Sequence, residues 1–288
     1  MNTPKEITTN YVALGATKTQ YTAVKMLVLG VMAGIFIGLG SVGSAIATAT
    51  VANTTIASLG KLLGALVFPV GLIMILITGG ELFTGNCLII ISVLEKQVRL
   101  KAMLKNWLFV YVGNFIGSIL VALIVVYGGT LSMFGNEVAV TAISTAVSKV
   151  TMPFGEAMLR GVLCNFLVCV AVFASFASKD VIGKVFAAFL PIMLFVLSGY
   201  EHSIANMTCI PVALFAVRNG DYYLAYGAAS NIANLASLTW GSMLLKNLLP
   251  VTIGNIVGGS GLVGFVCWFL HLSATRPELP AKKAGKKK

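Results

Sequence analysis

Two short polar segments interrupt long apolar runs of the sequence, at residues 78–86 and 198–206. Each contains a glutamate, Glu81 or Glu201, and the second also contains His202. Ionisable side chains in the middle of an apolar run are costly and usually functional. A histidine can also gain or lose a proton near neutral pH. These residues therefore predict a polar site inside an apolar environment.

The two glutamates occupy equivalent positions, which favours a structural role. We expect Glu81 and Glu201 to brace their loops by accepting backbone hydrogen bonds, because two carboxylates facing a pore would repel an anion. His202 has no counterpart, since the first segment has Leu82 there; this favours a pore role. Thr84 carries a hydroxyl that can donate to an anion, although a loop threonine is as often a turn or cap residue.

The composition indicates which elements position these residues. Of 288 residues, 58% are hydrophobic and only 10% are charged, whereas a soluble domain has about 25% charged residues. Apolar runs of about 20 residues match the hydrocarbon core of a bilayer, so we predict an all-α integral membrane protein. Six apolar stretches are found, at residues 23–46, 59–94, 107–127, 159–177, 185–217 and 249–272.

The second and fifth stretches are too long for one simple crossing, and each contains one of the polar segments. Glycine pairs, a carboxylate and an asparagine at mid-depth do not continue a helix comfortably. We therefore predict six transmembrane helices, of which the second and fifth are broken.

An internal duplication relates the first three stretches to the last three. Two patterns recur in the same order: Gly79-x-Glu81-x4-Asn86 with Gly199-x-Glu201-x4-Asn206, and Asn106-x6-Gly113-Asn114-x2-Gly117 with Asn247-x6-Gly254-Asn255-x2-Gly258. Such recurrence indicates an internal repeat. Three helices per copy is an odd number, so the second copy must enter from the opposite side, as in the inverted repeats of transporters. We place the copies at about 23–127 and 153–272.

The positive charges predict the orientation. With both ends inside, the cytoplasmic segments hold fifteen of the 20 basic residues and the outside holds five, which follows the positive-inside rule. We therefore predict a multi-pass protein of the cytoplasmic membrane with a cytoplasmic segment 1–22, a pore domain 23–272 and a basic cytoplasmic tail 273–288. The net charge of +11 points to an anionic leaflet rather than nucleic acid, because much of it lies in the tail.

Glycines one turn apart mark two helices for close packing. They form Gly30-x3-Gly34-x3-Gly38 and Gly254-x3-Gly258. Small residues at this spacing let helix backbones approach closely, so both helices should pack against protein.

The cysteines carry no metal pattern. All five lie in apolar runs without zinc-like spacing, so we expect reduced thiols and predict neither a metal nor another cofactor.

The broken helices point to a cavity. Backbone leaves the helical path at membrane depth only where it is buried in protein or lines a cavity. Helix ends present unpaired N–H groups that favour negative charge. A pore between the two breaks is therefore suited to an anion.

Four segments resemble the formate/nitrite transporter family, in order along the chain from about Lys18 to Leu272. They are Glu81-Leu82-Phe83-Thr84, Leu163-Cys164-Asn165-x2-Val168-Cys169, Gly199-Tyr200-Glu201-His202-Ser203-Ile204-Ala205-Asn206-Met207 and Asn247-Leu248-Leu249-Pro250-Val251-Thr252-Ile253-Gly254-Asn255. The resemblance implies pentamers of an aquaporin-like six-helix fold with one pore per protomer. It also implies conduction of small monovalent anions, with formate expected first and nitrite or hydrosulfide as alternatives.

The same resemblance implies roles for single residues. Phe68, Leu72 and Phe195 would form one hydrophobic constriction, and Leu82 with the neighbouring Phe83 loop the other. His202 and Thr84 would face the anion between them. Lys149, Asn165 and Asn255 would lie in or near the outer vestibule and stabilise negative charge. On this hypothesis a proton, from His202 or vestibule water, makes the anion a neutral acid that can cross the dry rings.

Three rival interpretations are disfavoured. An intramembrane hydrolase would need a base near Ser260, but His271 lies eleven residues further on, about 16 Å along a helix, so we predict no enzyme. A neutral-solute channel of the aquaporin kind would carry an Asn-Pro-Ala pair, which the sequence lacks. A scaffold would not need two polar breaks at mid-depth.

Overall fold

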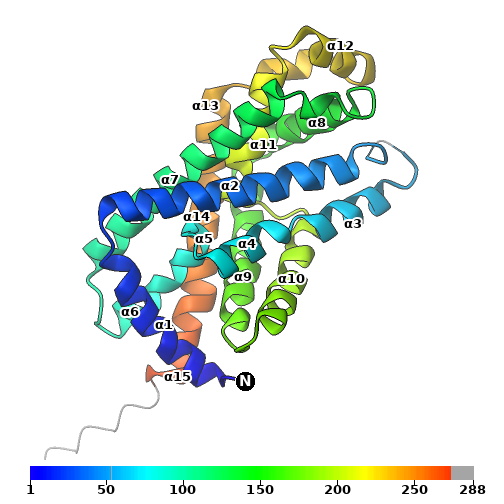
Figure 1. Ribbon diagram of the computed structural model, residues 1–288. Coiled ribbons are helices and arrows are strands. Elements are labelled where there is room, and N and C mark those ends of the chain that lie inside the picture. The colour runs from blue at the N-terminus through cyan, green and yellow to red at the C-terminus, as the bar shows by residue number, and fades with distance from the viewer. Residues whose placement is uncertain (53, 274–288) are drawn as a thin grey trace, which may run out of the picture.

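The computed structural model describes residues 1–52 and 54–273, and this part of the chain is helical throughout (Figure 1). Its elements, in chain order, are α1 (Pro4–Thr19), α2 (Ala23–Thr48), α3 (Ala57–Val67), α4 (Val70–Thr78), α5 (Phe83–Asn86), η1 (Cys87–Ile89), α6 (Ile90–Leu94), α7 (Leu100–Tyr127), η2 (Thr130–Ser132), α8 (Glu137–Thr151), α9 (Phe154–Ser175), α10 (Val181–Leu197), α11 (Ser203–Ala216), α12 (Gly220–Ala229), η3 (Ile232–Ser237), α13 (Trp240–Ser242), η4 (Met243–Leu248), α14 (Leu249–Ile256), η5 (Val257–Phe265) and α15 (Val266–His271). The basic tail predicted from residue 273 onward lies, beyond Ser273, outside the described residues.

Five helical stretches of the described chain are long and apolar enough to cross a membrane. They are Ala23–Thr48, Ala57–Thr78, Leu100–Tyr127, Phe154–Ser175 and Trp240–His271. Three shorter apolar helical stretches, Phe83–Leu94, Val181–Leu197 and Ser203–Ala216, complete the two broken units. The all-helical class is confirmed, whereas the count of six crossings stays a prediction.

Both predicted helix breaks are confirmed. After α4 the chain turns at Gly79, with a φ of 87°, and becomes extended at Leu82 before α5 begins. After α10 it turns at Gly199, with a φ of 69°, and becomes extended at His202 before α11 begins. A left-handed φ favours glycine because it has no Cβ. The two breaks therefore share one backbone design.

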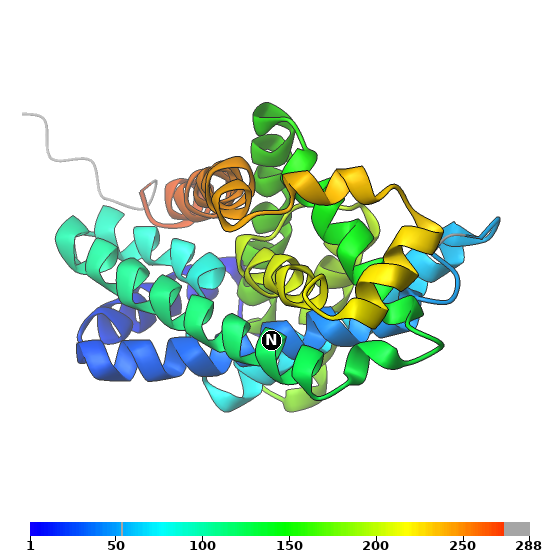
Figure 2. The ribbon, with the colours of Figure 1, turned by 90° about the horizontal axis from the view of Figure 1, so that it is seen from above.

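The glycine rows lie where two pairs of helices pack closely, as predicted. A Cβ on Gly34 would collide with the α7 backbone at Asn114, and one on Gly258 would collide with the α9 backbone at Val162. Figure 2 shows α2 lying alongside α7, and these two helices share the most extensive packing in the fold. Close packing of this kind holds membrane helices together without a hydrophobic driving force.

Two helices outside the apolar stretches cover opposite ends of the bundle. At one end α1 packs on η1, α6 and α15, and at the other α8 packs on α11 and α12 (Figure 1). The sequence predicted only a cytoplasmic segment at residues 1–22 and no helix at 137–151. Residue Thr3 caps α1 in a reciprocal pair with Glu6, which explains why this polar segment is helical.

Candidate functional site

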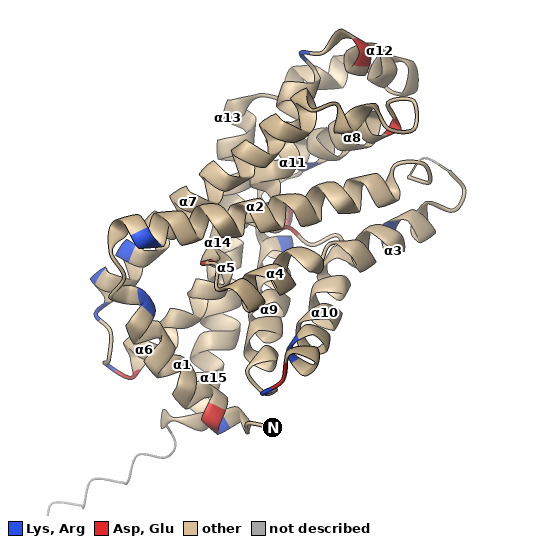
Figure 3. Ribbon diagram, in the orientation of Figure 1, with Lys and Arg blue, Asp and Glu red and all other residues tan. Residues whose placement is uncertain are grey.

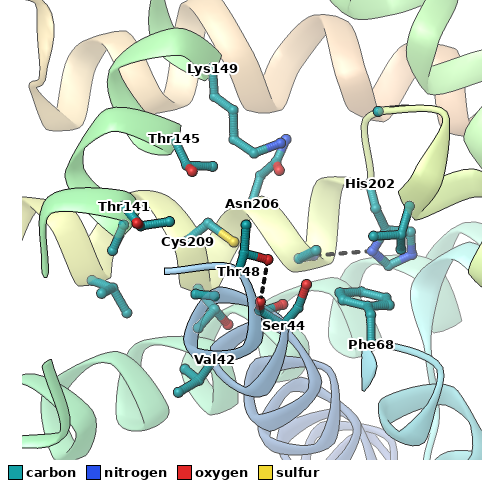
Figure 4. Close-up of a pocket in the computed structure, with 18 of the residues that line it drawn as sticks. Val42, Ser44, Thr48, Phe68, Thr141, Thr145, Lys149, His202, Asn206 and Cys209 are labelled. Carbon is teal, nitrogen blue, oxygen red and sulfur yellow. Dashed lines mark hydrogen bonds between the residues drawn. The ribbon is translucent and has the colours of Figure 1, made fainter. Parts of the chain in front are cut away.

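Two cavities lie on either side of the broken helices. We name the one beside α8 the outer cavity and the one beside α1 the inner cavity, after the orientation predicted from the basic residues. The outer cavity has a volume of about 240 Å³. Its polar lining is dominated by hydroxyl groups (Figure 4) and consists of Ser41, Ser44, Thr48, Thr141, Thr145, Lys149, Tyr200, Glu201, His202, Asn206 and Thr208.

The inner cavity is of similar size, but fewer hydroxyl side chains line it. Its volume is about 230 Å³, and Lys18 and Glu81 are its charged lining residues. Aliphatic and aromatic side chains form most of the remaining wall, namely Tyr11, Leu14, Tyr21, Leu72, Ile75, Leu76, Leu82, Val172 and Phe176. The two cavities therefore offer different surroundings to a polar solute.

The residues predicted to form constrictions divide between the cavities. Phe68 and Phe195 line the outer cavity and form an edge-to-face pair with ring centroids 5.4 Å apart. Leu72 and Leu82 line the inner cavity. The structure thus groups Leu72 with Leu82, not with Phe68 as predicted. Leu72 follows Phe68 by one helical turn, which is about 5.4 Å of depth.

Phe83 lies apart from both cavities, in contrast to the prediction. It packs edge to face against Trp107 and Tyr111, at centroid distances of 5.7 and 4.9 Å. The reason is that α5 begins at Phe83, so consecutive side chains there point in different directions. Leu82 faces the inner cavity while Phe83 anchors the loop to α7.

A hydrogen bond between His202 and Thr84 connects the two breaks. The distance from His202 Nε2 to Thr84 Oγ1 is 2.9 Å. His202 lines the outer cavity near Phe68 (Figure 4), and Thr84 follows Leu82 of the inner cavity by two residues. The structure therefore brings these two predicted residues together at the junction of the two segments.

The hydrogen bonds of His202 define its tautomer. The Ala205 N–H donates to Nδ1 at 3.1 Å, so Nδ1 carries no hydrogen, and the ring hydrogen of the neutral imidazole lies on Nε2. Nε2–H then donates to Thr84, whose own O–H is left free to donate elsewhere. An imidazolium would carry a second N–H at Nδ1, which would break the cap of α11.

Lys149 and Glu201 form a buried ion pair at the outer cavity. Lys149 Nζ lies 2.8 Å from Glu201 Oε1, and Asn206 Nδ2 donates to Glu201 Oε2 at 2.7 Å. Asn247 accepts from Asn206 and donates to the Lys149 carbonyl. The carboxylate is thus held by side chains, not by the backbone N–H groups expected from the sequence.

A matching network surrounds Glu81 at the inner cavity. Lys18 Nζ lies 3.0 Å from Glu81 Oε1, Asn86 Nδ2 donates to Glu81 Oε2 at 2.7 Å, and Asn106 accepts from Asn86. Sequence reasoning missed Lys18. The sequence did contain a signal for it. Gly30 and Gly161 are equivalent positions of the two repeats, and Lys18 and Lys149 each precede their glycine by twelve residues.

At each break, one asparagine side chain forms hydrogen bonds that link the break to the adjacent helix. Asn114 accepts from the Phe83 N–H and donates to the carbonyls of Gly30 and Glu81. Asn255 makes the same three kinds of bond at the second break. These paired contacts support the predicted duplication and extend it upstream to the two lysines.

Asn255 and Asn165, which the sequence predicted in or near the outer vestibule, do not line the outer cavity. Asn255 accepts from the Ser203 N–H and donates to the carbonyls of Gly161 and Glu201. Asn165 donates to the carbonyls of Thr84 and Asn255. Both amides are fully buried because the irregular backbone at each break needs partners for its polar groups.

No cluster of three or more His, Cys, Asp or Glu side chains that could hold a metal ion is found among the described residues. The five cysteines are free thiols; Cys209 is half-buried and lines the outer cavity.

The sequence and the fold are similar to those of known transport proteins. Residues 5–269 match the family described as "Formate/nitrite transporter". The "Formate channel FocA" of Escherichia coli (strain K12) is 35% identical over 260 residues, which cover 90% of each chain. The "Probable formate transporter" of Methanothermobacter thermautotrophicus is 36% identical and covers 86% of this chain and 89% of its own.

Solved structures of the same family are also similar to this chain in sequence and fold. A "Pentameric formate channel with formate bound" is 36% identical, with a TM-score of 0.78 over 87% of this chain and 98% of its own. An "FNT family ion channel" is 28% identical, with a TM-score of 0.77 over 92% and 98% of the two chains. The chain described here belongs to the formate/nitrite transporter family of membrane channels and transporters.

Proposed function

We propose that this protein conducts small monovalent anions, formate first, along a path from the outer cavity past His202 and Thr84 to the inner cavity. The observation that carries the proposal is the hydrogen bond between these two side chains, because it joins the break that lines the outer cavity to the break that lines the inner cavity. Relatives named as formate channels support formate as the substrate.

The apolar rings disfavour passage of a bare anion. Moving a carboxylate into a low-dielectric interior costs up to about 20 kcal/mol in the ideal case and several kcal/mol in real proteins. Protonating a simple carboxylic acid with a pKa of about 4 at pH 7 costs only about 4 kcal/mol. A neutral acid is therefore the cheaper species at the Phe68–Phe195 and Leu72–Leu82 rings.

The proton should come from cavity water rather than from His202. Imidazolium formation would break the Nδ1 cap of α11. The role that remains for His202 is to orient Thr84, so that the hydroxyl donates to the solute. The sequence-based hypothesis allowed either His202 or vestibule water as the proton source, and the present proposal keeps only water.

Lys149 does not act as an isolated cation. Its ion pair with Glu201 is formally neutral, so its Coulombic pull on an anion is partly cancelled. The amine retains N–H donors beyond those directed at Glu201, and these can solvate an anion entering the outer cavity. Lys18 has the equivalent position at the inner cavity.

The assembly and orientation form part of the proposal. We place both termini in the cytoplasm, with the inner cavity and α1 on that side, from the distribution of basic residues. Figure 3 shows Lys and Arg gathered mainly at the α1 end of the molecule. A pentamer with one inverted-repeat pore per protomer, and no enzymatic activity, follows from the family.

Uptake measurements on the full-length protein in liposomes test the proposal. Formate, nitrite, hydrosulfide and glycerol are supplied at pH 7 and pH 6. We expect saturable formate flux that rises up to about tenfold between the two values, because the neutral fraction of a weak acid rises tenfold per pH unit. Flux of glycerol without formate would overturn the anion assignment, and flux of nitrite or hydrosulfide alone would reassign the substrate.

A further inference from the structure

Two cations converge on the outward side of the second break. A methyl group placed on Gly199 would lie 3.2 Å from Lys61 Nζ and 3.9 Å from Arg160 Nη1. Arg160 Nη1 also donates to the Gly199 carbonyl at 3.3 Å. Lys61 comes from α3 and Arg160 from α9, and both helices pack against α10, which ends just before Gly199. Neither cation lines the outer cavity.

The positive charge at this point is not balanced. Arg160 pairs with Glu156 on its own helix. Lys61 is exposed and has no ion-pair or hydrogen-bond partner within the described part of the chain. Two cations against one carboxylate leave a net positive charge beside Gly199. A charge at this position within two apolar spans favours an anionic partner, because ions are poorly solvated there.

An apolar row leads along α10 to the same point. Ile182, Phe186, Leu190 and Leu194 repeat every fourth residue and are 71%, 65%, 58% and 47% exposed. The next position in the row is Ser198, the neighbour of Gly199. Residues four apart lie one above another on a helix face. The row therefore forms a continuous apolar strip that winds around α10 and ends at Ser198, beside the glycine that the two cations approach.

We propose that Lys61 and Arg160 bind the phosphate of an anionic phospholipid, whose acyl chain lies along the α10 strip. A cationic head next to a long apolar strip matches an amphiphile with a negative head, whereas a small inorganic anion would use only the cations. Basic pockets between membrane helices bind lipid head groups in this way. Arg is suited to phosphate because its planar guanidinium donates two parallel hydrogen bonds.

The site is coupled to the pore by the backbone. The Glu201 N–H donates to the Arg160 carbonyl at 3.4 Å, and Gly199 precedes His202 by three residues. A bound phosphate would hold Lys61 and Arg160 together over Gly199. It would thereby stabilise the loop that positions Glu201 and His202.

Native mass spectrometry of the purified full-length protein tests the proposal with phosphatidylglycerol and phosphatidylcholine as probes. Lys61→Gln and Lys61→Gln/Arg160→Gln are compared with Arg218→Gln/Lys246→Gln, which removes two exposed cations elsewhere. We expect the first two variants to bind phosphatidylglycerol about tenfold more weakly than wild type, since hydrogen bonds to charged groups are individually strong. The control should bind like wild type.

Two results would overturn the proposal. One is equal phosphatidylglycerol binding by Lys61→Gln and the control; Lys61 is exposed, so this variant should fold, and its elution in gel filtration verifies that. The other is a disulfide from Lys61→Cys to a neighbouring subunit, which would show that a second copy covers the patch. Loss of lipid binding without loss of formate flux would leave the proposed transport function untouched.

Discussion

At the scale of single residues, the proposed function depends most on the contact between Thr84 and His202. The imidazole uses Nδ1 to cap α11 and Nε2–H to hold the threonine oxygen. We propose that the hydroxyl hydrogen of Thr84 donates to a passing solute. Loss of the Thr84 hydroxyl should change the transport rate more than the stability of the protein.

We predict that Thr84→Val lowers formate flux by about tenfold or more, because a hydrogen bond to a charged group contributes about 1.5–3 kcal/mol. Thr84→Ser keeps the hydroxyl and should retain most of the flux. Initial uptake rates in liposomes measure both. Equal rates for the valine and serine variants would remove Thr84 from the pathway.

Lys149 offers a second residue-scale prediction. Lys149→Met leaves Glu201 buried without its cation, which should destabilise the protein by about 3–5 kcal/mol. The double variant Lys149→Met/Glu201→Gln also removes the buried charge and should recover most of that loss. Thermal unfolding in detergent measures both effects. If the double variant were as unstable as the single one, the ion pair would not be the reason.

Sequence reasoning found some of these residues and missed others for physical reasons. His202, Glu81 and Glu201 were identified because ionisable groups are conspicuous in apolar runs. Lys18 was missed because its backbone lies in a polar segment and only its long side chain reaches Glu81. Phe83 was misplaced because a one-residue difference at a helix start reverses the direction of a side chain.

At the scale of elements, the two breaks were predictable and the covering helices were not. Glycine, glutamate and asparagine inside an apolar run cannot be accommodated by a regular membrane helix, so the breaks followed from composition. The helices α1 and α8 lack a long apolar stretch, which was the signal used to find helices. A capping signal was present only for α1, at Thr3 and Glu6; Asn136, which precedes α8, makes no side-chain cap hydrogen bond.

The α1 cap gives an element-scale prediction about pH. Hydrogen bonds from the Thr3 backbone and side chain lower the pKa of Glu6 below its ordinary value of 4.5. Because the pKa of Glu6 is lower in the folded state, the cap stabilises α1 fully when the pH is above the pKa of the unfolded state. This stabilisation is lost as the pH falls through the pKa of the folded state. The start of α1 should therefore stay protected from pH 7 to pH 5 and loosen only below about 4.5.

Hydrogen exchange of the α1 amides, corrected for intrinsic rates, measures this. Glu6→Gln should abolish the acid-dependent step and leave α2 unaffected. A step between pH 6 and pH 7 would contradict the assignment to Glu6.

At the scale of the whole molecule, the two cavities form the ends of the path that we propose across the membrane. Cys209 lines the outer cavity and is half-buried, whereas Cys164 and Cys169 are fully buried. We predict that a membrane-impermeant methanethiosulfonate reagent modifies Cys209 from outside the cell and blocks formate flux.

Cys209→Ser is the matched control and should transport formate but resist the reagent. Right-side-out and inside-out vesicles distinguish the two sides. Block of inside-out vesicles alone would reverse the proposed orientation.

The central claim is that formate crosses the apolar rings as a neutral acid. Its most direct test records formate entry and internal pH together, in liposomes that contain the protein and a trapped pH-sensitive dye. The account predicts one proton entering with each formate, at a rate that does not respond to an imposed membrane potential. Formate entry without internal acidification, at a rate that follows the potential, would contradict it.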